Sequence, residues 1–372
     1  MKQFLFAIPL LFALISCNTT QPLTKVTPST QPTSVSNSDA SSTKKHATTP
    51  QLSNKEKQDK QFAELSELIS EAELKKNLYI IASPEMEGRN AGSEGEIKAG
   101  NFIADYYKKL GVNGPNNTYF QLIPAGTFKS VKGQMRNVMG FVKGSEKPEE
   151  IVVITAHYDH EGIKHGKLYA GADDDGSGTV AVMEVARVFR EAEKKGIQPK
   201  RSVLFLHVSG EEKGLLGSKY YAEHPLFPLE NTIANINIDM IGRVDYEHNE
   251  ATRDFLYVIG SNMLSTDLYH TVIEANKSLK IDLDYRYDDP NDKNRFYYRS
   301  DHFNFAKHNI PAVFFFNGVH DDYHQPGDTP DKIEYDLSNI PFEFITLDKF
   351  YGKQVFDYLK NRDINKETIE KI

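Results

Sequence analysis

Short apolar runs alternate with helix-like segments along most of this chain, and this alternation constrains its fold more than any other feature. The runs Ile151–Ile154 and Val203–Leu206 are apolar at every position, as is typical of strands buried on both faces of a sheet. The runs that we expect to form strands are 151–154, 203–206, 233–238, 255–259 and 312–316. The segments that we expect to form helices are 178–190, 215–222, 264–276 and 342–359. This order predicts an α/β fold of three layers, α/β/α, with helices on both faces of a central mixed, mostly parallel sheet.

Two more helices are expected ahead of the first strand. Apolar residues recur at helical spacing from Phe62 to Leu74, and they do so again within Ser93–Leu110. Gly111 follows the second segment directly, and a glycine at this position commonly ends a helix. Between the two helices, residues 83–90 have the composition of a turn.

The first residues resemble a bacterial lipoprotein signal. The apolar run Phe4–Ile15 follows one positive charge and is too short to cross a bilayer comfortably. It ends in Leu-Ile-Ser-Cys, which resembles a lipobox, and Cys17 is the single cysteine of the chain. We therefore expect residues 1–16 to be a signal peptide and Cys17 to carry lipid, which would anchor an exported protein in the cell envelope. The alternative is an ordinary signal peptide that contains a cysteine. Asn18, in place of Asp, favours the outer membrane and its periplasmic surroundings.

The rest of the chain divides into a tether and one domain. Residues 17–60 are rich in Ser, Thr, Pro, Gln and Lys, a composition that cannot bury enough apolar surface to fold, so we expect a disordered tether. Residues 61–372 are predicted to form a single catalytic domain, for which no oligomer is required. The formal net charge of -8 is mild for 372 residues, and no basic region indicates nucleic-acid binding. A single cysteine excludes an internal disulfide.

Ionisable residues follow three of the predicted strands. His157 comes after the run 151–154, Glu211 and Glu212 come after 203–206, and Asp239 comes directly after 233–238. Because ligands of α/β proteins bind beyond the carboxyl ends of the strands, we expect these side chains to converge. Taken singly, such residues are more often helix caps or turn residues, so the inference depends on their occurring together.

Two loops add further candidate ligands. Asp173, Asp174 and Asp175 stand together in a glycine-flanked turn before a predicted helix, and only one of them needs to bridge two metals. His324 lies in a loop rich in turn residues, where a lone histidine would usually be solvated. His157 and His324 therefore supply two imidazoles, and the acidic residues supply the carboxylates.

These residue types are the ligands that zinc accepts, and a catalytic zinc keeps an open position. One bridging carboxylate would let the five ligands His157, Asp174, Glu212, Asp239 and His324 hold two zinc ions, a recurring device for hydrolysis. Cobalt or manganese could also fill such sites. Glu211, next to Glu212, is then the candidate general base. Asp159 could accept a hydrogen bond from the second ring nitrogen of His157.

The remaining histidines have no comparable setting, and we interpret them as structural or solvated. They are His160, His165, His207, His224, His248, His270, His302, His308 and His320.

The motifs, in this order, resemble the co-catalytic di-zinc aminopeptidases of peptidase family M28. They are His-x-Asp from 157, Gly-Ala-Asp-Asp-Asp-x-Ser-Gly from 171, Glu-Glu-x-Gly-x-x-Gly-Ser from 211, Ile-Asp-Met from 238 and Tyr-His-x-x-x-Asp from 323. The resemblance extends from about Leu78 to Leu359. It implies a zinc-exopeptidase fold in which Asp174 bridges the metals.

The resemblance also implies a role for each site residue. His157 and Asp239 would complete one zinc, and Glu212 and His324 would complete the other. Glu211 would be the base, Asp159 would orient His157, and the Asp174–Asp175 peptide bond would be cis. A tyrosine shortly before Ser300 would polarise the scissile carbonyl, with Tyr297 favoured by spacing and Tyr298 as the alternative.

The function that this resemblance implies is a zinc-dependent aminopeptidase that acts on peptides and is anchored to the membrane through Cys17. A glutaminyl cyclase of the same fold would use one zinc. A carboxypeptidase would need a basic pocket for a free carboxylate. A catalytically dead binding module would have lost ligands, and none is missing here.

Overall fold

The computed structural model describes residues 64–249 and 251–335. The predicted signal peptide, Cys17, the tether and the closing helix expected at 342–359 all lie outside the described residues. Within them, no helix is both long enough and apolar enough to cross a membrane.

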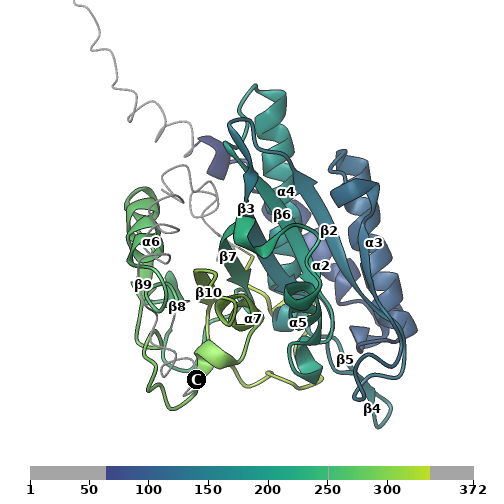
Figure 1. Cartoon of the computed structure of the whole chain (residues 1–372). Coiled ribbons are helices and arrows are strands. Elements are labelled where there is room, and N and C mark those ends of the chain that lie inside the picture. Colours follow the sequence, from purple (N-terminus) through teal and green to yellow (C-terminus); the bar gives the residue numbers. More distant parts are fainter. Residues whose placement is uncertain (1–63, 250, 336–372) are drawn as a thin grey trace, which may run out of the picture. The chain divides into compact units, whose positions relative to one another are not determined.

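The described residues contain a central sheet of eight strands in the order β1-β2-β6-β3-β7-β10-β8-β9 (Figure 1). These strands are β1 (Phe120–Ile123), β2 (Met135–Val142), β3 (Lys147–His157), β6 (Arg201–Val208), β7 (Thr232–Ile238), β8 (Phe255–Ile259), β9 (Asp282–Asp284) and β10 (Ala312–Phe316). The pairs β6–β3, β3–β7, β7–β10 and β8–β9 are parallel, whereas β1–β2, β2–β6 and β10–β8 are antiparallel. A separate hairpin pairs β4 (Gly162–Lys164) with β5 (Lys167–Tyr169). The predicted mixed, mostly parallel sheet is confirmed, and its parallel centre is the part that carries site residues.

Helices cover both faces of this sheet, as predicted (Figure 1). One face packs against the cluster that includes α2 (Glu71–Ile81), α3 (Glu94–Leu110), α4 (Gly178–Lys194) and α6 (Thr266–Leu279). The other face packs against α5 (Leu216–Glu223) and the short α7 (His302–Ala306). The three-layer α/β/α arrangement therefore holds for the described residues.

Strand β3 shows why the solid apolar runs were informative. Val152 and Ile154 pack into the core on the side of α4, whereas Ile151 and Val153 pack into the core on the side of α5 and α7. Successive side chains of a strand point to opposite faces, so a strand between two helical layers needs apolar residues at every position.

Local capping explains where the first helices begin and end. The Ser93 hydroxyl accepts the Glu96 backbone N–H at 3.3 Å, and Gly111 ends α3 with a left-handed φ of 73°, as expected. The first predicted helix is shifted, because Ser70 caps α2 and the helix begins at Glu71. Residues 64–66 form a separate helical piece that turns at 67–68.

Strands β1, β2 and β9 were not predicted. β2 contains Arg136, Asn137 and Gly140, so it does not read as an apolar run. The Asn137 side chain is nevertheless fully buried, where its amide donates to Gln121 Oε1 at 2.8 Å and to the Gly217 carbonyl at 2.9 Å. A buried polar side chain is tolerated only with such partners, and these come from distant segments.

We predict that Ile154→Ala lowers the free energy of unfolding by about 2–5 kcal/mol, because it leaves a cavity at a fully buried position of β3. Ile163→Ala serves as the matched control, since Ile163 is 57% exposed and its truncation should change stability by less than about 0.5 kcal/mol. Equilibrium denaturation of the two variants measures both values, and equal losses would contradict the assigned core.

Candidate active site

Three neighbouring strands end at one edge of the sheet and bring predicted site residues together. His157 is the last residue of β3, Asp239 directly follows β7, and Glu211 opens a 3-10 turn shortly after β6. β3 lies between β6 and β7 and is parallel to both. Their carboxyl ends therefore meet at the edge where α/β proteins bind ligands.

The acidic loop before α4 divides its three carboxylates between two tasks. Asp173 Oδ1 accepts the Gly242 N–H at 2.7 Å, and Asp175 Oδ1 accepts the Gly178 N–H at 2.9 Å. The carboxylates of Asp173 and Asp175 thus accept hydrogen bonds from backbone N–H groups, whereas the Asp174 carboxylate faces His157 and His324. The peptide bond between Asp174 and Asp175 is cis, as expected.

One side of Asp174 faces His157 and Asp239. His157 Nε2 lies 3.2 Å from Asp174 Oδ1 and 3.6 Å from Asp239 Oδ1. The other oxygen of Asp239 accepts the Ser300 hydroxyl at 2.6 Å, which fixes the orientation of the carboxylate. Suitably placed atoms of His157, Asp174 and Asp239 all lie within 4.8 Å of one another, as a metal site requires.

The other side of Asp174 faces Glu212 and His324. His324 Nε2 lies 3.0 Å from both Asp174 Oδ2 and Glu212 Oε2. The structure thus brings together all five residues expected to bind metal, with Asp174 shared between the two sides.

His160 lies on the same side of Asp174 as Glu212 and His324, although the sequence predicts a structural or solvated histidine. Its ring is fully buried, and its Nδ1 lies 2.8 Å from Glu212 Oε1 and 3.7 Å from Asp174 Oδ2. The signal that could have found it is its place three residues after His157, at the same strand end. Glu161 also approaches, with one oxygen 3.8 Å from His324 Nδ1.

The arrangement fits a bound cation. Several buried atoms that could bind a metal make no hydrogen bond among the described residues, although ion-pair partners lie near them: Asp174 Oδ2, Asp239 Oδ1, Glu212 Oε1 and His160 Nδ1. Buried polar atoms without hydrogen bonds are costly, and metal coordination would satisfy them together. Imidazole and carboxylate donors are the ligand types that zinc accepts.

Burial and the crowding of carboxylates shift the pKa values of the site in different directions. Burial raises the pKa of Glu211 well above its usual range, although His157 opposes the shift. Burial lowers the pKa of His324, but Asp174 and Glu212 outweigh it and raise that pKa to about 10. Burial works against the ionised form of Asp174, yet contacts with His157 and His324 hold its pKa well below the ordinary value. Protons on imidazoles thus balance the carboxylates, and a metal cation would compete with these protons.

Asp159 joins two of the strand-end segments. Its Oδ1 accepts the backbone N–H of Glu211 at 3.1 Å. The Nδ1 of His157 lies 3.2 Å from the backbone carbonyl of Asp159 and 3.7 Å from its carboxylate. Asp159 therefore lies beside His157 Nδ1, but the nearer acceptor is its backbone oxygen and not the carboxylate that was expected.

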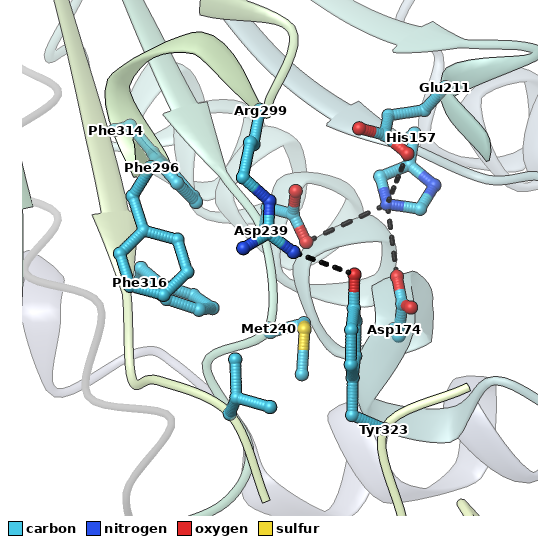
Figure 2. Close-up of a pocket in the computed structure, with 11 residues that line it drawn as sticks. His157, Asp174, Glu211, Asp239, Met240, Phe296, Arg299, Phe314, Phe316 and Tyr323 are labelled. Atoms are coloured by element: carbon cyan, nitrogen blue, oxygen red, sulfur yellow. Dashed lines mark hydrogen bonds and ion pairs between the residues drawn. The ribbon is translucent and has the colours of Figure 1, made fainter. Parts of the chain in front are cut away.

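A pocket opens beside the candidate metal ligands (Figure 2). Four of the predicted residues line it, namely His157, Asp174, Glu211 and Asp239. The rest of the lining is mainly apolar, with Arg299 and Tyr323 as polar members: Met240, Phe296, Arg299, Phe314, Phe316, Val319 and Tyr323.

The tyrosine expected in the pocket is not the one that lines it. Tyr297 is buried in an aromatic cluster, with its ring 5.3 Å from that of His302, and it is absent from the pocket lining. Tyr298 packs edge-on against Phe303, with ring centroids 5.0 Å apart. The lining tyrosine is Tyr323, so the assignment based on spacing is corrected. Burial in the apolar cluster explains the position of Tyr297.

The fold is an α/β fold, and its donor set is of the kind that can hold a catalytic metal ion. A family model described as peptidase family M28 matches residues 137–344, and the chain belongs to this family.

Relatives of known sequence match the chain over short segments. Over 113 residues, 28% of this chain and 22% of the relative, it is 39% identical to a probable zinc metalloprotease of Pyrenophora tritici-repentis. Over 109 residues, 29% of this chain and 22% of the relative, it is 36% identical to aminopeptidase YwaD of Bacillus subtilis. The matched part of each relative is thus less than a quarter of its length.

Solved structures share the fold at low sequence identity. LapB from Legionella pneumophila has a TM-score of 0.61 and 21% identity, covering 77% of this chain and 73% of its own. BSAP, a zinc aminopeptidase from Bacillus subtilis, has a TM-score of 0.56 and 17% identity, covering 78% and 95%. A Porphyromonas gingivalis glutaminyl cyclase has a TM-score of 0.55 and 18% identity, covering 78% and 99%.

We predict that zinc binding releases protons and tightens as the pH rises from 6 to 8. The pKa of His324 near 10 means that its imidazole is protonated in the metal-free protein at neutral pH, so a metal must displace that proton. Each released proton strengthens the apparent affinity about tenfold per pH unit. Calorimetry in buffers of different ionisation enthalpy measures both quantities. Affinity that is independent of pH, without proton release, would contradict this charge balance.

Proposed function

We propose that this protein is a zinc-dependent aminopeptidase that holds two zinc ions and removes N-terminal residues from peptides. The observation that carries the proposal is the Asp174 carboxylate, which faces donors on both sides beside a pocket lined by Glu211. Membership of peptidase family M28 supports the same activity.

The donors divide between the two proposed ions. His157, Asp239 and Asp174 would hold one zinc, while Glu212, His324 and Asp174 would hold the other. Zinc held there would supply Lewis acidity to a peptide carbonyl and to water.

Glu211 is suited to move a proton. Its carboxylate lines the pocket, and Oε2 lies 4.0 Å from His157 Nε2, so it stays next to the donors without belonging to either group. Because burial raises its pKa, the carboxylate is a stronger base than an exposed one, as suits a group that accepts a proton and returns it to a leaving amine. The hydrogen bond from the Glu211 backbone to Asp159 helps to fix its position.

One lining carboxylate supports a preference for chain ends that carry an amino group. Asp174 and Asp239 are proposed zinc ligands, so Glu211 is the carboxylate of the lining that is left to attract an α-ammonium group. The apolar part of the lining would accept the first side chain of the peptide. Tyr323, in place of Tyr297, is the phenol available to donate a hydrogen bond to the reacting carbonyl.

Two rival activities are each favoured by one observation. The solved glutaminyl cyclase has a similar fold, but His157 is present here and, with Asp239, completes a second set of donors that a one-zinc enzyme would not need. A carboxypeptidase needs a cation for a free carboxylate, and Arg299 lines the pocket. The binding-module alternative is disfavoured, because all five expected ligands come together.

The protein's location is proposed from its first residues. A lipid on Cys17 would anchor the catalytic domain in the bacterial cell envelope, in the periplasm or at the outer membrane, through the segment 17–60.

We predict that Glu211→Gln keeps its zinc but loses at least about a hundredfold in kcat, the scale of a general base. Hydrolysis of aminoacyl p-nitroanilides by the full chain, with and without chelator, and the zinc content of the same samples measure both. Glu149→Gln is the matched control, because Glu149 is exposed near the opposite end of β3. An active Glu211→Gln variant would exclude the assigned base. N-acetylated peptides and a peptide with N-terminal glutamine test the two rival activities.

We also predict that Cys17→Ser moves the protein from the membrane fraction to the soluble or unprocessed fraction, because the lipid has no thiol to join. Cell fractionation and the mass of the mature N-terminus measure this. Unchanged membrane association with an unlipidated N-terminus would exclude the anchor.

A further inference from the structure

Arg299 stands at the pocket with its position set by two contacts. It follows the short 3-10 turn Phe296–Tyr298, and its guanidinium carbon lies 5.0 Å from the centre of the Phe296 ring. One Nη donates a hydrogen bond to the Tyr323 hydroxyl at 3.3 Å (Figure 2). Tyr323 in turn stacks on His324, with ring centroids 4.0 Å apart. The guanidinium is therefore tied to the residue beside a proposed metal ligand.

Arg299 differs from most arginines of the described chain in its charge partners. Several of the others pair with carboxylates: Arg187, Arg190, Arg201, Arg243, Arg253 and Arg286. Across residues 64–249 and 251–335, no carboxylate lies within ion-pair distance of Arg299. Its charge is thus available to a ligand in the pocket.

The lining combines this cation with three carboxylates, those of Asp174, Glu211 and Asp239. Asp174 and Asp239 are proposed zinc ligands, whereas Arg299 lies outside both ligand sets as a separate basic group. A guanidinium presents a planar fork of N–H donors that matches a carboxylate in two parallel hydrogen bonds. The Tyr323 hydroxyl accepts a hydrogen bond from one guanidinium N–H of Arg299, and the other N–H groups remain to bind a carboxylate.

We propose that Arg299 binds a carboxylate of the substrate, so that the enzyme prefers short peptides with an acidic group next to the bond that is cleaved. This inference rests on the proposed aminopeptidase function and adds the substrate class. The carboxylate can come from the C-terminus of a dipeptide, from the side chain of the first residue or from the side chain of the second. All three sources offer the same chemistry to Arg299.

Three matched pairs of substrates separate these sources with the full chain. Leu-Ala against Leu-Ala-amide tests the C-terminus, Glu-p-nitroanilide against Gln-p-nitroanilide tests the first side chain, and Leu-Glu-amide against Leu-Gln-amide tests the second. For the pair that uses the true source, we expect kcat/KM to favour the acid at least about tenfold, a difference of about 1.4 kcal/mol. Arg299→Gln should reduce that ratio about tenfold, and Arg299→Lys should give an intermediate ratio, because it keeps the charge without the fork.

Arg295→Gln is the matched control. Arg295 lies over the Tyr298 ring at 4.8 Å and does not line the pocket, so its removal should leave the acid-to-amide ratio unchanged. Melting temperatures of all variants show whether they fold. If Arg299→Gln fails to fold, Arg299→Lys carries the test.

The outcomes distinguish this inference from the proposed function. If all pairs are hydrolysed with acid-to-amide ratios of kcat/KM near one, the role of Arg299 is overturned and the aminopeptidase remains. The same conclusion follows if Arg299→Gln leaves the ratio unchanged. Absence of hydrolysis overturns the aminopeptidase. In that case, calorimetric binding of the same pairs tests Arg299, and equal affinity for acid and amide overturns its role.

Discussion

The concentration of buried carboxylates at one edge of the sheet is the constraint on which the rest of the site depends. Asp173, Asp174 and Asp175 are each 3% exposed or less, and uncompensated charges of this kind would be very costly to bury. The fold compensates them with backbone N–H groups, imidazoles and a proposed metal. Arg89 adds a fully buried positive charge nearby, whose guanidinium donates to the backbone carbonyls of Tyr158, Ile81, Ala170 and Gly171.

These compensating bonds also give the site its geometry. The Asp328 carboxylate accepts the backbone N–H groups of Asp173 and Asp174 at 2.9 to 3.1 Å, which ties the loop after β10 to the loop before α4. Asp173 in turn contacts His320 at 3.1 Å. A reaction that depends on placing a base and two metals needs ligands held by such outer contacts. Asp173, Asp175 and Asp328, which accept backbone N–H groups, are therefore as much a part of the site as Asp174.

The same charge distribution connects the proposed activity with the proposed substrate preference. Glu211, the lining carboxylate outside both proposed ligand sets, favours an ammonium group, and the Arg299 guanidinium favours a carboxylate. Arg299, Tyr323 and His324 follow one another in contact, so substrate recognition and metal binding share one structural unit.

The sequence by itself determined the α/β class, the central strands and the five candidate ligands, because each depends on a local signal. An apolar run such as 151–154 must be buried on both faces, and an ionisable residue after such a strand must lie at its carboxyl edge. Only the tertiary structure decided that β2 joins the sheet, that His160 reaches Glu212 and that Tyr323, with Arg299, lines the pocket where Tyr297 was expected. These outcomes depend on partners far apart in the chain, such as Gln121 and Gly217 around Asn137. No pattern within a few residues records which of two neighbouring side chains faces the core and which faces the pocket.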